Sequence, residues 1–275
     1  MEKVEEKYHL KDFWDFGLKQ FRSAIFGITI ILSLIVTTFI KIPHLARYDT
    51  LLICVIVIQM ILLVSKYERA YDLIPIMVFH VLGMILEIFK VKHGSWSYPD
   101  AGLFKIMDVP LYSAFMYSAI GSYIVRAIKE FDLEAINWPH WLMSIGISVL
   151  IYLNFFSGTF GFDFRNIFYL FILMIFWKTK FTFVLRTKRY QMPAILSFFL
   201  IGLFIYFAEN IGSYFSAWTY SYQLKAWQFV DLGKISSWTL LIIVSIIIVI
   251  ELQRYFSKKI KVKNIAKCKC NLATR

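Results

Sequence analysis

The chain alternates long apolar segments with short charged ones. A helix needs about 20 mostly apolar residues to cross the hydrocarbon core of a bilayer, where its backbone must satisfy its own hydrogen bonds. The pattern predicts an all-α, polytopic integral membrane protein with eight transmembrane helices, over residues 23–41, 49–65, 72–91, 109–128, 137–156, 166–185, 192–212 and 234–253. The apolar run of the sixth helix stops at Trp177, so Lys178 and Lys180 must extend toward the interface.

The distribution of basic residues orients these predicted helices. With the N-terminus inside, 22 of the 30 lysines and arginines fall on the inner side. Cytoplasmic loops carry an excess of Lys and Arg, and an even number of crossings returns the chain to its starting side. We therefore expect both termini in the cytoplasm.

The same spans divide the chain into four parts. The N-terminal segment 1–22 is cytoplasmic and has an apolar face around Phe13 and Trp14, so it either lies along the inner membrane surface or extends the first span. Two four-helix units follow, at 23–128 and 137–253, and residues 254–275 form a basic cytoplasmic tail.

Composition narrows the class of protein. Hydrophobic residues make up 59% of the chain and charged residues only 17%, against about 25% charged in soluble domains. The net charge of +12 does not indicate a nucleic-acid partner, because the basic residues lie in loops between apolar spans. We expect membrane lipids as the surroundings and no nucleic acid; the sequence leaves the oligomeric state open.

A motif recurs after the third and seventh predicted spans. Glu87 is followed by Trp96, Ser97 and Tyr98 at the same spacing as Glu209 is by Trp218, Thr219 and Tyr220. Both copies follow E-x8-W-[ST]-Y at an offset of 122 residues, and each precedes an aspartate near the next span. This spacing predicts a 4+4 parallel internal repeat, in which both motifs lie at the outer face.

The two glutamates are the candidate catalytic residues, together with His80. An ionisable residue within a span is costly and indicates function, although Glu87 and Glu209 are also near enough to the interface to reach water. His80 precedes Glu87 by two helical turns, so the pair can relay protons; a single His among apolar residues is equally consistent with a core hydrogen bond.

Aromatic and polar residues around the motifs are the candidate substrate-binding residues. Aromatic belts are ordinary at membrane interfaces, but they do not explain the duplicated spacing. No glycine-rich phosphate loop, nucleophile elbow or cluster of metal ligands is present, so we expect no metal and no cofactor. The candidates are Trp96, Tyr98, Trp218, Tyr220, Asn210, Asp108 and Asp231.

The chain also resembles a known family. Ala208-Glu209-Asn210-Ile211-Gly212 leads into Trp218-Thr219-Tyr220, and Val109-Pro110-Leu111-Tyr112 and Asn154-Phe155-Phe156 agree with it. These stretches resemble the bacterial membrane-protein family DUF817 over residues 20–255. The resemblance implies a bacterial plasma membrane and brings no established activity.

A second resemblance concerns the motif alone. Glutamates followed by W-x-Y elements at helix ends are similar to those of membrane-embedded carotenoid cyclases and hydratases. That resemblance implies a buried acid, Glu87 or Glu209, that protonates an alkene while aromatic rings shelter the cation.

Three functions remain open from the sequence. The first is a membrane enzyme that acts on a lipid or isoprenoid near the outer leaflet by general acid catalysis. The second is a proton-coupled transporter or permease built on the repeat, with a small-molecule substrate. The third is a membrane component without chemistry. An outer cavity open toward lipid favours the enzyme, whereas a water path that reaches both sides favours the transporter.

Overall fold

A computed structural model of the chain describes residues 6–256 and 262–263. These residues are predominantly helical, as the sequence predicts, and most of the predicted basic tail lies outside them. The α-helices are α1 (Glu6–Ser23), α2 (Ile25–Phe39), α3 (Arg47–Val64), α4 (Leu73–Lys92), α5 (Tyr112–Glu130), α6 (Trp141–Ser157), α7 (Arg165–Phe176), α8 (Ala194–Tyr214) and α9 (Gly233–Phe256).

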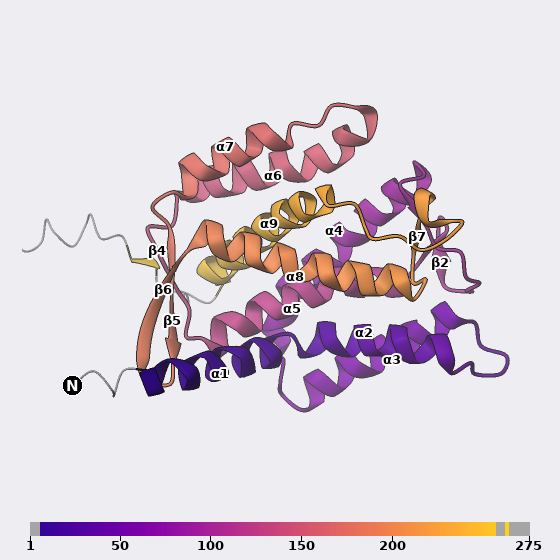
Figure 1. Ribbon diagram of the computed structural model, residues 1–275, viewed down its shortest axis with the longest axis horizontal. Helices are drawn as coiled ribbons and strands as arrows, with labels where there is room; N and C mark the ends of the chain where they lie inside the picture. The colour runs from indigo at the N-terminus through magenta and orange to yellow at the C-terminus, as the bar shows by residue number, and fades with distance from the viewer. Residues whose placement is uncertain (1–5, 257–261, 264–275) are drawn as a thin grey trace, which may run out of the picture.

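Four of these helices form the centre of the bundle. Helix α4 packs along α5, and α8 packs along α9. Figure 1 shows α6 and α7 on one side of these four helices and α1, α2 and α3 on the other. Helix α9 is the most enclosed, because its apolar residues from Leu240 to Ile250 are almost all buried.

Close approach of the central helices depends on two glycines. A Cβ atom at Gly83 of α4 would lie 2.3 Å from the ring of Tyr117 on α5. A Cβ atom at Gly202 of α8 would lie 2.8 Å from the backbone nitrogen of Thr239 on α9. Small residues at such contacts let helix backbones approach closely. In a membrane, this close packing promotes helix association, because lipid tails are as apolar as the side chains and provide no hydrophobic driving force.

Five of the described helices are long and apolar enough to cross a membrane: α3, α4, α6, α8 and α9. A sixth crossing results if α1 and α2, which meet at an angle of 66° near Ala24, form one broken span. The prediction of eight crossings is therefore not confirmed. Helix α7 has only 12 residues, and the C-terminal part of α5 carries Arg126, Lys129 and Glu130.

The predicted helix over 166–185 is wrong in its second half. Helix α7 ends at Phe176, and residues Lys180–Leu185 form strand β5. The segment Phe181-Thr182-Phe183-Val184 is rich in aromatic and β-branched residues, which favour strands when partner strands are available. Two neighbouring strands supply those partners.

The strands gather at the two ends of the bundle. Near α1 lies a sheet of order β6-β5-β4-β8, in which β5 is antiparallel to β4 and β6 and β8 is parallel to β4. At the opposite end, β1 pairs with β7 and β2 with β3 (Figure 1). The strands are β1 (Trp96–Ser97), β2 (Lys105–Ile106), β3 (Val109–Pro110), β4 (Glu134–Ile136), β5, β6 (Lys188–Pro193), β7 (Thr219–Tyr220) and β8 (Val262–Lys263).

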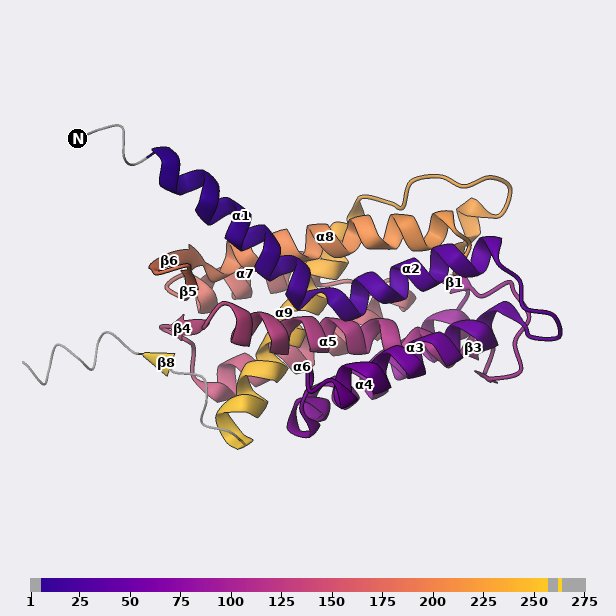
Figure 2. The same cartoon turned by 90° about the horizontal axis from the view of Figure 1, so that it is seen from below.

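The N-terminal segment is a helix in its own right. Figure 2 shows α1 turning away from the axis of α2. Leu10, Phe13 and Trp14 are each about three-quarters exposed, whereas Asp12 and Ser23 are buried. Helix α1 therefore bends away from α2 and presents apolar side chains to its surroundings.

Candidate functional site

The two copies of the repeated motif meet at one end of the bundle. Strand β1 pairs with strand β7 in antiparallel register, so that Trp96 lies opposite Tyr220 and Ser97 opposite Thr219. The rings of Trp96 and Tyr220 contact edge to face, with centroids 6.1 Å apart. Two segments that are 122 residues apart in the sequence therefore form a single aromatic cluster.

Glu87 is buried at the end of α4 and accepts three hydrogen bonds. Its Oε2 accepts the indole N–H of Trp96 and the hydroxyl of Tyr98, both at 2.8 Å. Its Oε1 accepts the hydroxyl of Tyr117 on α5, also at 2.8 Å. Both carboxylate oxygens are thus engaged, and the motif holds β1 against the helix pair α4 and α5.

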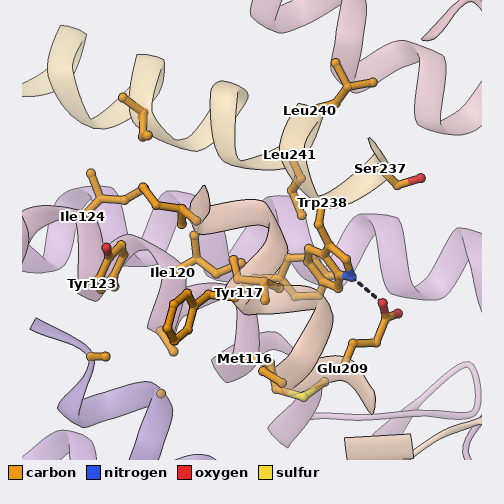
Figure 3. Close-up of a pocket in the computed structure, with 18 of the residues that line it drawn as sticks. Met116, Tyr117, Ile120, Tyr123, Ile124, Glu209, Ser237, Trp238, Leu240 and Leu241 are labelled. Carbon is orange, nitrogen blue, oxygen red and sulfur yellow. Dashed lines mark hydrogen bonds between the residues drawn. The ribbon is translucent and has the colours of Figure 1, made fainter. Parts of the chain in front are cut away.

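Glu209 occupies the matching place at the end of α8 and accepts two hydrogen bonds. Its Oε1 accepts the hydroxyl of Tyr220, and its Oε2 accepts the indole N–H of Trp238 on α9 (Figure 3). Trp218, the motif tryptophan, instead lies against Gly212, where a Cβ atom would meet its ring at 2.2 Å. In the second copy, therefore, the indole N–H that bonds to the glutamate comes from Trp238 of the next helix and not from Trp218 of the motif.

The bounds of the surrounding helices differ by nearly the offset of the motif. A shift of 122 residues moves 73–92 (α4) onto 195–214 and 112–130 (α5) onto 234–252, almost the bounds of α8 and α9. Tyr117 and Trp238 donate from the helix that follows each glutamate. They are 121 residues apart, one fewer than the offset of the motif. Each carboxylate is therefore held by its own loop and by the helix that packs on it.

Both carboxylates line one large cavity. Its volume is about 1040 Å³, and its walls come mainly from α1, α2, α5, α8 and α9. Apolar side chains such as Ile120, Ile124 and Leu241 form most of the wall, and Glu209 and Trp238 also line it (Figure 3). Glu209 accepts from Tyr220 of β7, so these two residues belong to the end where β1 pairs with β7. The cavity is thus a long apolar space with its polar groups gathered mostly at one end.

Lys234, at the start of α9, lies over the aromatic cluster. Its Nζ is 4.8 Å from the centroid of Trp96 and 4.5 Å from that of Tyr220. These contacts stabilise an ammonium, because the face of an aromatic ring carries negative potential. Lys234 also lines the cavity, together with Lys90 and Arg165.

Burial affects the tyrosines of the motif. It raises the pKa of the Tyr98 phenol well above its usual range, and the nearby carboxylate of Glu87 raises it further. The pKa of Tyr220 is raised in the same way by burial and by Glu209. Both phenols therefore keep their protons and act as hydrogen-bond donors.

Two of the predicted site residues have other partners. His80 contacts the hydroxyl of Ser118 on α5 through Nδ1, at 3.1 Å, and packs edge to face on Phe115. Asn210 accepts the backbone N–H of Val230 at 2.9 Å and donates to the carbonyl of Tyr206. Neither is among the described residues that line the cavity. Asn210 holds the loop before α9 and does not bond to Glu209.

The two predicted aspartates lie in loops. Asp108 is exposed in the turn between β2 and β3, where Met107 and Asp108 have φ values of 49° and 64°. Two such values in succession are typical of a tight hairpin turn. Asp231 lines the cavity and accepts the backbone N–H of Gly233 at 2.8 Å, so it caps the start of α9.

Three residues of the site are not among those that the sequence predicted: Tyr117, Trp238 and Lys234. Aromatic residues are common throughout this chain, so neither Tyr117 nor Trp238 stood out by type. Their nearly matching places in the two halves were an available signal. Among the described residues, no group of three or more His, Cys, Asp or Glu side chains is arranged to hold a metal ion.

Comparisons with known proteins agree on one family. The model of the family described as "Protein of unknown function (DUF817)" matches residues 12–246. "Uncharacterized protein YoaT" of Bacillus subtilis (strain 168) is 43% identical over 245 residues, which cover 89% of this chain and 93% of the relative. No solved structure matches the chain. This chain is therefore a member of the DUF817 family.

Proposed function

We propose that this protein is an integral membrane enzyme that takes a lipid or isoprenoid chain into its cavity and acts on it with a carboxylic acid. The observation that carries the proposal is the cavity itself, an apolar space of about 1040 Å³ with Glu87 and Glu209 in its wall. Ligand sites combine apolar walls with a few polar groups that fix orientation. This cavity has that composition.

The shape of the polar end supports acid catalysis. General acid catalysis requires a proton donor within hydrogen-bond reach of the reacting group. The rings of Trp96, Trp218 and Tyr220 line the cavity beside the carboxylates. Aromatic rings stabilise the positive charge that develops when the carboxylic acid gives its proton to an alkene of the substrate, and the carboxylate that remains takes a proton back from the cation.

Glu209 is the acid in this proposal, and Glu87 positions the aromatic cluster. Glu87 accepts three bonds, two of them on one oxygen. Glu209 accepts one bond on each oxygen, so each oxygen keeps a lone pair for a proton or a substrate group. The Tyr220 hydroxyl then orients the carboxyl group.

The membrane topology belongs to the same proposal. We place the β1 and β7 end at the outer leaflet and the sheet of β4, β5 and β6 at the cytoplasmic side of a bacterial plasma membrane. Strands β5 and β6 and their connecting turn carry Lys180, Arg186, Lys188 and Arg189, in agreement with the positive-inside rule. The matching bounds of α4 with α8 and of α5 with α9 support a 4+4 repeat.

A pair of substitutions tests whether the cavity holds a lipid. Ala208 of α8 lines the cavity, whereas its neighbour Phe207 is exposed and does not. Lipids bound to the purified protein are identified by mass spectrometry. Ala208→Trp should obstruct the cavity beside Glu209 and reduce the copurified lipid, and Phe207→Trp should retain it. Equal lipid content in both variants would contradict the proposal.

A second pair tests the acid. Glu209→Gln should leave substrate unconverted in lipid extracts of cells that express the protein, compared with the wild type. Glu251→Gln is the matched control, because Glu251 also accepts an indole N–H, from Trp138 at 2.9 Å, but lies outside the cavity lining. Conversion of the substrate must persist in Glu251→Gln. If Glu209→Gln converts the substrate as well as Glu251→Gln does, Glu209 is not the acid.

The alternative of a transporter has one observation in its favour. The cavity also touches Phe13 of α1 and Phe183 of β5, toward the opposite end of the bundle from Lys234. A path of this length suits passage of a molecule, but its apolar wall does not suit water or ions. Counterflow of labelled lipid in vesicles, undiminished in Glu209→Gln, would favour transport over catalysis.

A further inference from the structure

The ammonium of Lys234 lacks an acceptor. Within the described residues its Nζ makes no hydrogen bond and no ion pair, although it lies against two aromatic rings. An ammonium carries three N–H donors, and ring faces do not replace a hydrogen-bond acceptor. Lys234 is half-buried and lines the cavity, so a ligand there that carries oxygen atoms would give these donors their acceptors.

Two more cations stand at the same end of the cavity. Lys90 and Arg165 line it and are close enough to Lys234 for their charges to repel one another. Arg165 reaches the start of α9, where its guanidinium donates to the carbonyl of Gly233 at 3.3 Å. Lys90 donates to the hydroxyl of Thr159 at 2.7 Å. Arg165 is paired with Asp163, and Glu209 and Glu87 attract Lys234 from a distance, so Lys234 and Lys90 are the cations of this end that no carboxylate contacts in the described part of the chain.

The acids of this end already have partners. Asp163 forms an ion pair with Arg165 at 2.6 Å, and Asp231 caps α9. Glu87 and Glu209 accept their bonds from tyrosine and tryptophan. None of these four carboxylates lies within ion-pair distance of the Lys234 ammonium in the described part of the chain.

Ser237 of α9 adds a further donor to the cavity. The backbone N–H groups that begin α9 already bond to Asp231 and Leu232, so the helix start itself offers no free donor there. Ser237, in the second turn of α9, lines the cavity (Figure 3), and its hydroxyl has no partner among the described residues. Together with Lys234, this hydroxyl offers donors to more than one oxygen of a ligand.

From this arrangement we propose that the substrate is a phosphate-bearing single-chain lipid, whose phosphate binds Lys234, Lys90 and Ser237 while its chain occupies the apolar cavity. The inference rests on the proposed function, because it names the substrate of that cavity. Phosphate fits better than a neutral headgroup, since its oxygens accept several charge-assisted hydrogen bonds at once. The chain extends from α9 past Leu241 and Ile120 toward α1.

Binding of two probes to the full chain in detergent micelles tests the inference. Farnesyl phosphate and farnesol share one apolar chain and differ only in the phosphate. We expect the wild type to bind farnesyl phosphate at least about tenfold more tightly, the value of one charge-assisted hydrogen bond. Lys234→Gln should remove this preference and leave farnesol binding unchanged, while Lys234→Arg should retain most of it.

Matched variants separate the effect of a charge in the site from the effect of the overall positive charge of the protein. Lys225→Gln removes an exposed lysine from the loop before α9 and should bind both probes as the wild type does. Lys90→Gln gives an independent test if Lys234→Gln does not fold, and it should reduce the preference for phosphate in the same direction.

Each outcome decides between the proposals. Equal binding of farnesyl phosphate and farnesol by the wild type, or equal effects of Lys234→Gln and Lys225→Gln, overturns the phosphate inference and leaves the cavity proposal standing. Binding of neither probe overturns both. Inorganic phosphate that binds as tightly as farnesyl phosphate shows that the site takes the free ion, and the lipid assignment then fails.

Discussion

The hydroxyl of Tyr117 offers the sharpest test of how the site is held together. It is the one described donor to Oε1 of Glu87, at 2.8 Å, and its ring is buried against Gly83. Tyr117→Phe removes a single oxygen atom and keeps the packing of the ring. The carboxylate oxygen then remains buried without a donor.

The expected cost follows from that lost bond. Leaving a buried acceptor without its donor costs about 1–3 kcal/mol of stability. For a chain of this size, that loss lowers the unfolding temperature by about 2–12 °C. Reversible unfolding in detergent, followed by circular dichroism, measures the change.

A matched variant and a double-mutant cycle isolate the contribution of this hydrogen bond. Tyr214→Phe removes an exposed hydroxyl from α8, and we expect almost no change in the free energy of unfolding. In the Glu87→Gln background, the added cost of Tyr117→Phe should shrink, because the carboxyl group that accepts this bond is gone. If Tyr117→Phe is no more destabilising than Tyr214→Phe, Glu87 does not depend on this donor and the reasoning is refuted.

Two further predictions concern packing and pH. Gly83→Ala places a Cβ atom against Tyr117 and should destabilise the chain by about 1–3 kcal/mol, whereas Gly146→Ala, with nothing within 4 Å, should be neutral or stabilising; thermal unfolding of the two variants compares them, and equal shifts would contradict the close contact. Because the pKa values of Tyr98 and Tyr220 are raised in the folded chain, the stability they contribute is complete below the unfolded pKa of about 10 and falls as the pH rises above it. Titration of tyrosinate absorbance should show these phenols ionising only as the chain unfolds, and their ionisation together with exposed tyrosines would refute this.

The sequence predicted the helices well where local information was sufficient. Each predicted span corresponds to a helix, and α4 and α8 lie within a few residues of the predicted bounds. Apolar runs bounded by charges fix such helices locally. The helix predicted for the segment after Phe176 was wrong. This segment forms a strand because it pairs with β4 and β6, and no local pattern reveals which partner strands are near.

The candidate site was predicted in part. The repeat placed Glu87 and Glu209 in equivalent positions, and the structure brings both motifs into one cluster. The partners of His80 and Asn210 were not predictable, because a hydrogen bond between helices depends on their rotation about their axes. The same holds for Trp238, which supplies the indole donor that Trp218 does not.

The sequence by itself determined the apolar helices, the clustering of basic residues and the duplicated Glu, Trp and Tyr spacing, because each depends on periodicity and composition along the chain. Only the tertiary structure decided that Trp96 lies opposite Tyr220, that Lys234 covers both rings, and that the helices leave a partly open cavity between them. These features arise from the packing of side chains between helices distant in sequence. That packing is set by the whole bundle at once.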